Sequence, residues 1–349
     1  MAQLRKNQIV TVNTSPRILV VGPAWVGDMV MAQSLFKTLK QKQPDCQIDV
    51  LAPAWTFSLL DRMPEVTQAI EMPLGHGKLG LHQRITLGRS LRDNRYDQAI
   101  LLPNSWKSAL TPFFARIPVR TGYIGECRWG LLNDTRRLDK ELLTMTVQRF
   151  VALGHKPGAT EPPKYPAPQL RIVESDRDQV IAKFAINTDK TILGLCPGAE
   201  YGPAKRWPAA AYAQVANHYL EQGWQVWLFG SEKDSQVCAE INTITEQQCV
   251  DFSGRTTMAE ALDLMSLVNR FVTNDSGLMH VAAALNKPLV AIYGSSDPGF
   301  TPPIHDLAKV ISLGLECSPC FERECPLGHT NCLNNIPPKQ VISELASLN

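Results

Sequence analysis

The sequence predicts an α/β protein built from two doubly wound parallel-sheet domains. Its 349 residues exceed the roughly 250 to 300 at which a single hydrophobic core stops growing. Short aliphatic runs alternate with segments of helical periodicity, which is typical of parallel sheets covered by helices. Five prolines interrupt this alternation between residues 157 and 168, and it then starts again. We therefore expect an N-terminal extension over residues 1–16, a first domain with its linker over 17–168, and a second domain over 169–349.

The first strand and helix set the pattern of the first domain. Ile18 to Val21 form an apolar run without polar interruption, which fits a strand buried on both faces. Gly22 and Pro23 end this strand, and apolar residues recur at helical spacing from Asp28 onward. The later elements of this domain are expected as strands at 48–52, 69–72, 98–102 and near 120–124, and as helices at 56–62, 83–94, within 105–115 and around 141–153.

The second domain repeats the alternation. Its strands are expected at 192–196, 225–229, near 250–252, 271–273 and 289–293. Its helices are expected at 175–185, 209–222, 235–244, 258–268 and 277–284, with a cysteine-rich segment and a final helix after them. Ligands of open α/β sheets bind at the carboxyl ends of the strands, so two such domains would form a cleft with one substrate on each side.

Composition and charge exclude several classes of protein. Hydrophobic residues make up 44% and charged residues 19%, as in ordinary globular domains. The formal net charge of +2 carries no nucleic-acid signature, so we expect no nucleic-acid partner, and an anionic ligand would need a local basic patch. The first sixteen residues lack the pattern of a signal peptide, and no apolar run approaches ~18 residues. We therefore expect a cytoplasmic protein.

The cysteines fall into two groups. Nine is an odd number, and five of them are scattered, which suits reduced thiols. The other four stand within sixteen residues near the C-terminus: Cys317, Cys320, Cys325 and Cys332. They could close a tetrahedral zinc site or hold an iron–sulfur centre, although the spacing matches no standard zinc finger. Reduced thiols or a redox-dependent disulfide are the alternatives, and a metal here would be structural.

Asp28 is the candidate catalytic residue of the first domain. It opens the helix that follows the first strand, at the sheet edge where ligands bind. A carboxylate in this position can either cap free backbone N–H groups or point into the cleft. The residues of this stretch alone leave both interpretations open.

Two loops of the second domain carry residue types suited to a nucleotide. After the strand at 192–196, a loop rich in glycine and proline leads to Lys205, whose ammonium group would contact a diphosphate. After the strand at 225–229, Glu232 is placed to accept hydrogen bonds from a ribose diol. The alternative for both side chains is a solvated surface position.

Two further loops complete the expected donor site. Residues 253–257 are expected to surround the base with backbone groups, and the helix that starts near residue 277 has free N–H groups that favour phosphate. Helix capping explains one polar residue at the start of that helix but not the whole cluster. The histidine one turn further along could equally be a buried core residue whose hydrogen bonds are made within the protein. The expected donor residues in these two loops are Thr256, Asp275, Ser276, Gly277 and His280.

A basic cluster in the first domain is the candidate acceptor site. Six arginines and lysines lie between residues 116 and 140, with Tyr123 and Trp129 among them. Such a cluster is either a solvated face or a binding site for an anionic acceptor. We take Arg120 and Lys107 as the acceptor-binding candidates.

Several common nucleotide and hydrolase motifs are missing. Neither domain has G-x-G-x-x-G at its first turn, and the chain lacks G-x-S-x-G, H-E-x-x-H and G-x-x-x-x-G-K-[ST]. These absences argue against NAD-dependent hydride transfer, serine hydrolysis and ATPase chemistry.

Five stretches of the sequence together resemble one enzyme family. They are GPAWVGDMVMAQSL, LPNSWKSAL, RTGYIGECRWGLLND, CPGAEYGPAKRWP and VTNDSGLMHVAAALNKPLVAIYG. Through them the chain resembles glycosyltransferase family nine, the ADP-heptose transferring enzymes, from Arg17 to about Pro303. The resemblance implies a GT-B fold, in which two Rossmann-like domains face each other across a cleft. The first domain would bind the acceptor and the second the sugar nucleotide.

The resemblance also implies a reaction. L-glycero-D-manno-heptose would pass from ADP-heptose to the first heptose of heptosyl-Kdo-lipid A, with inversion at the anomeric carbon, in the lipopolysaccharide core synthesis of a Gram-negative bacterium. The lipid-linked acceptor implies peripheral contact with the cytoplasmic face of the inner membrane. Catalysis would require no cofactor, since Lys205 and a helix N-terminus would stabilise the leaving group.

The motifs also imply roles for single residues. Asp28 matches the family's proposed catalytic base, Lys205 the lysine at the donor phosphate and sugar, and Glu232 the acidic residue at the ribose. Residues 275–277 match the donor-binding loop, whereas residues 200–201 differ from the hydroxyl residues that face the phosphate in one relative. Two other interpretations stay open: a sugar-nucleotide epimerase of the same fold, and a non-catalytic nucleotide- or metal-binding protein.

Overall fold

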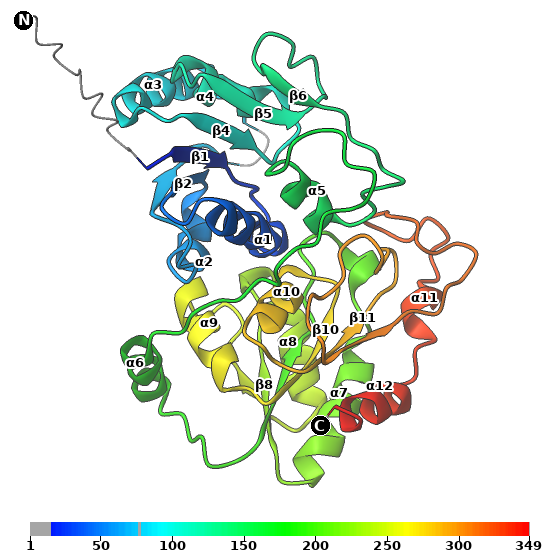
Figure 1. Cartoon of the computed structure of the whole chain (residues 1–349). Helices are drawn as coiled ribbons and strands as arrows, with labels where there is room; N and C mark the ends of the chain where they lie inside the picture. Colours follow the sequence, from blue (N-terminus) through cyan, green and yellow to red (C-terminus); the bar gives the residue numbers. More distant parts are fainter. Residues whose placement is uncertain (1–14, 76–77, 349) are drawn as a thin grey trace, which may run out of the picture.

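Two parallel six-stranded sheets form the framework of the protein (Figure 1). The computed structural model describes residues 15–75 and 78–348, so most of the expected extension over 1–16 lies outside the described residues. The first sheet has the strand order β3-β2-β1-β4-β5-β6, and the second has β12-β11-β10-β7-β8-β9. Numbered within its own domain, each sheet has the order 3-2-1-4-5-6 of a doubly wound fold. The predicted fold class is confirmed.

The first domain contains most of the predicted elements. Its strands are β1 (Arg17–Val21), β2 (Gln47–Ala52), β3 (Gln68–Glu71), β4 (Gln98–Leu101), β5 (Val119–Tyr123) and β6 (Asp134–Arg136). Its α-helices are α1 (Val26–Lys42), α2 (Phe57–Leu60), α3 (Leu81–Ser90), α4 (Leu110–Phe114) and α5 (Thr146–Ala152). The edge strand β6 was not predicted. The helix expected around 141–153 begins only at residue 146, because the Asp139 carboxylate accepts the N–H groups of Glu141 and Leu142 in a separate turn.

The second domain follows the prediction up to β11. Its strands are β7 (Ile192–Cys196), β8 (Gln225–Leu228), β9 (Val250–Asp251), β10 (Arg270–Asn274), β11 (Leu289–Ile292) and β12 (Ala308–Ile311). Its α-helices are α6 (Glu174–Phe184), α7 (Ala209–Glu221), α8 (Ser235–Ile244), α9 (Met258–Leu267), α10 (Gly277–Ala284), α11 (Asn331–Asn334) and α12 (Pro338–Ala346). The edge strand β12 and the short helix α11 were not predicted, whereas a final helix was.

The strands are buried on both faces because alternate residues enter different cores. Along β1, Leu19 and Val21 pack toward the outer layer of the first domain. Ile18 and Val20 point the other way, into a core that also contains residues of the second domain. A third cluster fills the outer side of the second sheet, between its strands and helices such as α7 and α12. The uninterrupted aliphatic runs of the sequence are thus explained by burial on both sides.

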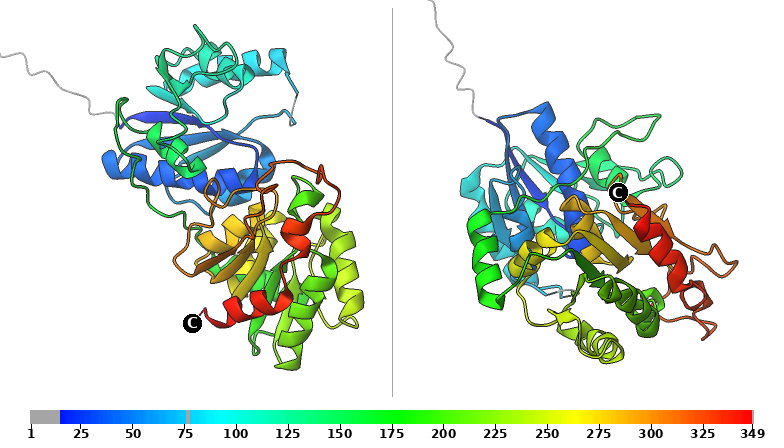
Figure 2. Two further views of the ribbon diagram at one scale, coloured as in Figure 1. Left: turned by 90° about the vertical axis from the view of Figure 1, so that its right-hand side faces the viewer. Right: turned by 90° about the horizontal axis from the view of Figure 1, so that it is seen from below.

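The two domains share one continuous hydrophobic core. Figure 2 shows the two domains lying against each other. Helices α1 and α10 pack against each other between the sheets, and α5 packs on α1. The contact is close because two glycines face it: a Cβ on Gly27 would lie 2.6 Å from the His280 ring, and a Cβ on Gly277 would lie 2.9 Å from Val26. The N-termini of α1 and α10 are therefore held side by side.

The proline-rich connection runs along α1 before it enters the second domain. Gln33 of α1 donates to the carbonyl oxygen of Gln169 at 2.8 Å and accepts its N–H at 2.7 Å. Nearby, the guanidinium of Arg62 meets the carboxylate of Asp263 at 2.9 Å, and both side chains are buried at the domain junction. The expected boundary at residue 168 stays a prediction, and the two sheets lie on either side of it. Over the described residues, none of the helices has the length and apolarity needed to cross a bilayer.

Candidate active site

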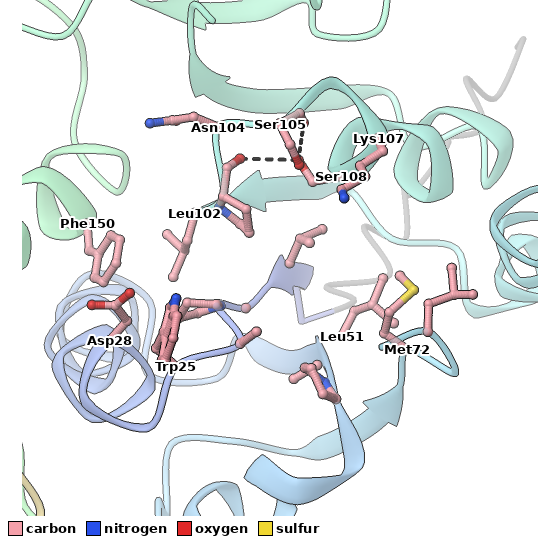
Figure 3. A pocket seen from close by; sticks show the side chains of 18 of the residues that line it. Trp25, Asp28, Leu51, Met72, Leu102, Asn104, Ser105, Lys107, Ser108 and Phe150 are labelled. Carbon is pink, nitrogen blue, oxygen red and sulfur yellow. Dashed lines mark hydrogen bonds between the residues drawn. The ribbon is translucent and has the colours of Figure 1, made fainter. Parts of the chain in front are cut away.

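A cavity of about 530 Å³ opens at the carboxyl ends of β1 and β4, where the first sheet reverses its strand order (Figure 3). Ligands of doubly wound sheets bind at this switch point. Figure 3 shows Asp28 on one side of the cavity beside Phe150 and Trp25, with Asn104 and Lys107 on the opposite side. The wall of the cavity therefore contains a carboxylate, other polar groups and apolar side chains.

Asp28 lies in the first turn of α1 and lines this cavity. The strand-to-helix turn places it there: Gly22 donates its N–H to Leu51 at 2.9 Å, and α1 begins at Val26. Burial raises the pKa of Asp28 to about 6, while Lys205 lowers it and Asp275 raises it. The side chain thus faces the cavity, and its pKa suits a general base near neutral pH.

Lys205 and Asp275 meet at the equivalent switch point of the second sheet. Lys205 ends the short 3-10 turn Pro203–Lys205 after β7, and Asp275 directly follows β10. The ammonium of Lys205 lies 2.5 Å from the Asp275 carboxylate, and the ring of Tyr201 lies 5.0 Å from the same ammonium group. Both charged side chains influence the pKa of Asp28. The base candidate of one domain is therefore within electrostatic reach of the cation candidate of the other.

His280 lies in the contact between the domains. It is buried in α10, and its ring packs against Gly27 at the start of α1. Burial lowers the pKa of His280 to about 4; Asp275 raises it and Lys205 lowers it further. The histidine is thus neutral at physiological pH. The structure places it as a packing residue beneath the site that helps set the distance between α1 and α10.

The other expected donor residues surround the second switch point. Glu232 is exposed at the start of the turn after β8, and its carboxylate lies over Gly254, where a Cβ would approach Oε2 to 2.3 Å. Thr256 is half-buried in the same loop, and Thr257 caps α9 by accepting the N–H of Glu260. The remaining two expected residues, Ser276 and Gly277, form the N-terminus of α10.

The acceptor candidates occupy different environments. Lys107 lines the cavity of the first domain. Arg120 instead directs its guanidinium to the carbonyl oxygens of Leu131 at 2.6 Å and Ile117 at 2.5 Å, and stacks on Phe113 at 5.6 Å. This arrangement favours a structural role in the loops beside β5, so among the two candidates Lys107 is the better placed for a ligand.

Sequence reasoning missed two residues that position the site. Asn274, the last residue of β10, accepts the N–H of Trp207 at 3.1 Å and donates to the carbonyl oxygen of Pro197 at 2.6 Å. It thereby fixes the loop of Lys205 against the loop of Asp275. Asp234 accepts two hydrogen bonds from Ser231 and orders the turn that carries Glu232. The signal for Asn274 was an amide at the end of an otherwise apolar strand.

Comparisons with known proteins place the chain among sugar transferases. The family model described as glycosyltransferase family 9 (heptosyltransferase) matches residues 84–331. Lipopolysaccharide heptosyltransferase 2 of Escherichia coli is 48% identical over 341 residues, spanning 95% of this chain and 98% of that protein. Lipooligosaccharide heptosyltransferase 2 of Haemophilus ducreyi is 46% identical over 350 residues, spanning 95% and 99%.

Solved structures agree. The structure of E. coli ADP-heptose lps heptosyltransferase II superposes with a TM-score of 0.85 at 47% identity, covering 95% of this chain and 98% of that one. A family 9 glycosyltransferase from Veillonella parvula, 22% identical, shares the fold with a TM-score of 0.80 over 95% and 97% of the two chains.

Two Rossmann-like domains with facing switch points, together with these superpositions, define the molecule as a GT-B glycosyltransferase. A base candidate on the first domain and a cation on the second fit this class, because a transferase must activate an acceptor and stabilise a leaving group. The chain belongs to glycosyltransferase family 9, the heptosyltransferases.

Proposed function

We propose that this enzyme transfers L-glycero-D-manno-heptose from ADP-heptose to the first heptose of heptosyl-Kdo-lipid A, with inversion, in lipopolysaccharide core synthesis. Its 48% identity to lipopolysaccharide heptosyltransferase 2 of E. coli supports the substrate pair. One structural observation carries the mechanism. Asp28, at the switch point of the first sheet, lies within electrostatic reach of Lys205 and Asp275, at the switch point of the second, because the N-termini of α1 and α10 pack side by side.

The donor would lie on the second domain. Its diphosphate would replace Asp275 as the ion-pair partner of Lys205. It would also accept hydrogen bonds from the N–H groups at the N-terminus of α10. Released from the lysine, Asp275 would accept hydrogen bonds from sugar hydroxyls. Glu232 would bind the ribose, and the loop of Thr256 would contact the base. In this proposal the positive charge at the leaving group comes from the protein, so catalysis needs no metal.

In the proposed transfer, one bond forms, one bond breaks, and the proton of the acceptor hydroxyl is taken up within the site. A hydroxyl of the acceptor heptose attacks the anomeric carbon of the donor, and Asp28 accepts the hydroxyl proton as the new C–O bond forms. The bond between the anomeric carbon and the β-phosphate oxygen breaks, and ADP leaves with the electron pair. Attack from the face opposite the leaving group inverts the anomeric centre.

The acceptor would enter the cavity of the first domain. Lys78 and Lys107 line the cavity and offer cations to the anionic groups of a Kdo-lipid A core. Trp55 and Trp106, which are 49% and 39% exposed, lie at or beside the same cavity. Exposed tryptophans next to cations suit the headgroup region of a bilayer. These features support our proposal that the enzyme contacts the cytoplasmic face of the inner membrane.

The proposal is tested with purified enzyme, ADP-heptose and heptosyl-Kdo-lipid A. We expect the acceptor to gain the mass of one heptose and ADP to be released only when the acceptor is present. Kdo-lipid A without its first heptose is the matched control and should not react. Isomerisation of the donor without an acceptor would instead identify an epimerase, and binding of ADP-heptose without turnover would identify a non-catalytic protein.

A further inference from the structure

The segment between β12 and α11 is held in place without regular secondary structure. From residue 312 to residue 330 it contains no helix or strand, and the stretch 321–324 is exposed. An ordered connection of this length needs interactions that replace a hydrophobic core. The same segment carries three of the four clustered cysteines, and α11 carries the fourth.

The four thiols line one small cavity. Its volume is about 20 Å³, enough for a single water-sized sphere, and the four cysteines make up much of its wall. Cys317, Cys320 and Cys325 all lie within electrostatic reach of Cys332, as expected for side chains that line the same cavity. All nine cysteines are free thiols. The cavity therefore presents four soft ligands and no disulfide.

A tight turn directs backbone donors at one of these sulfur atoms. The N–H of Thr330 lies 3.4 Å from Sγ of Cys325. The backbone N–H groups of Leu327, Gly328 and His329 in the same turn also interact with this sulfur. Backbone donors that converge on a sulfur stabilise the thiolate, which is the form that binds metal.

We propose that Cys317, Cys320, Cys325 and Cys332 together bind one thiophilic metal ion of the zinc(II) or iron(II) class. In the described part of the chain, no three ligating side chains already converge on one point. The ion would therefore draw the thiolates inward from the cavity wall into a tetrahedral set and release their protons.

Such an ion would stabilise the loop of Lys205, on the side of the active site that we propose binds the donor. The cysteine-rich segment packs on the loop that leads to Lys205: the N–H of Ala204 donates to the carbonyl oxygen of Arg323 at 3.0 Å, and the Tyr201 hydroxyl donates to that of Phe321 at 2.5 Å. A Cβ on Gly202 would lie only 2.4 Å from the Arg323 oxygen. The metal would act at a distance, by holding this segment against the loop of Lys205.

Metal content of the whole chain tests the proposal directly. We would express the protein with zinc and iron in the medium, purify it anaerobically without chelators, and measure metals by mass spectrometry. About one ion per chain is expected for the native protein and for Cys127→Ser, which removes an exposed cysteine of the first domain. Cys325→Ser should lower the occupancy by about tenfold or more.

A second measurement avoids dependence on a variant that fails to fold. Cobalt(II) added to the metal-free native chain should saturate at about one equivalent, with thiolate charge-transfer absorption and tetrahedral d–d bands. Native protein without metal that also gives no thiolate band with cobalt would overturn the proposal. Acid-labile sulfide would overturn it too, because it indicates an iron–sulfur cluster in place of a single ion.

Discussion

Replacing Asp28 with asparagine is expected to stabilise the fold while it removes the proposed catalytic base. Burial in the cavity wall disfavours the carboxylate and raises its pKa from 3.8 to about 6. Asparagine keeps the shape of the side chain but has no charge to desolvate. The native residue thus costs stability at neutral pH, as is common for groups that serve catalysis.

The sign and size of the effect follow from proton linkage. The folded-state pKa lies above the unfolded one, so the free energy of unfolding falls as pH rises from 3.8 through about 6 and is then constant. At 1.36 kcal/mol per pKa unit, the full cost is about 3 kcal/mol, an upper value because the side chain is only partly buried. The stabilisation by Asp28→Asn should therefore grow by about 2 kcal/mol between pH 4.5 and pH 7.5.

Urea unfolding followed by tryptophan fluorescence at these two pH values measures this difference. Asp45→Asn, which changes an exposed carboxyl group, is the matched control and should show no such growth. A stabilisation of Asp28→Asn that is independent of pH, or a loss of stability at pH 7.5, would refute the argument. In the same variant kcat should fall by about 10²- to 10⁴-fold.

Three further changes test other parts of the structure. Lys205→Ala should weaken ADP-heptose binding by about tenfold or more in calorimetric titration, because it removes the cation that we propose binds the diphosphate; native affinity would contradict that role. Gly27→Ala should destabilise the protein by about 1 to 3 kcal/mol, since its Cβ would meet the His280 ring at 2.6 Å, and thermal unfolding will show whether α1 and α10 need this close contact. Arg62→Met should lower the free energy of unfolding by about 3 kcal/mol, because it leaves Asp263 buried without its partner. The double variant Arg62→Met/Asp263→Leu should recover most of this loss in chemical unfolding. A double variant as unstable as the single one would argue against a buried-charge penalty.

Central strands were predictable from sequence, whereas edge strands were not. β1 and β10 each contain apolar residues that are buried, at 18–21 and 271–272, because both faces of a central strand are covered. β6 and β12 lie at sheet edges, and their residues are largely half-buried or exposed, so they carry no apolar pattern that distinguishes a strand from a loop. Their places are set by pairing with β5 and β11, which is a tertiary effect.

The sequence identified the candidate residues of the site individually, but it did not show that they lie close together. Asp28, Lys205 and Asp275 each follow a predicted strand, which marks all three as candidates. Their mutual approach depends on how the domains pack, and that packing rests on small contacts such as Gly27 against the His280 ring. Local periodicity contains no information about such a contact. For Arg120, the basic cluster in the sequence does not reveal that the guanidinium donates hydrogen bonds to backbone carbonyls, and its role at the acceptor stays a prediction.

The apolar interior that runs unbroken through both halves of the enzyme constrains how it can move. Wide separation of the halves would bring the facing sides of α1 and α10 into water, at a cost of about 25 cal/mol for each Å² of apolar surface exposed. We therefore expect substrates to enter through small rotations of the two domains about the contact between α1 and α10. For the same reason neither half should be obtainable as a soluble fragment, and the enzyme should unfold as one cooperative unit.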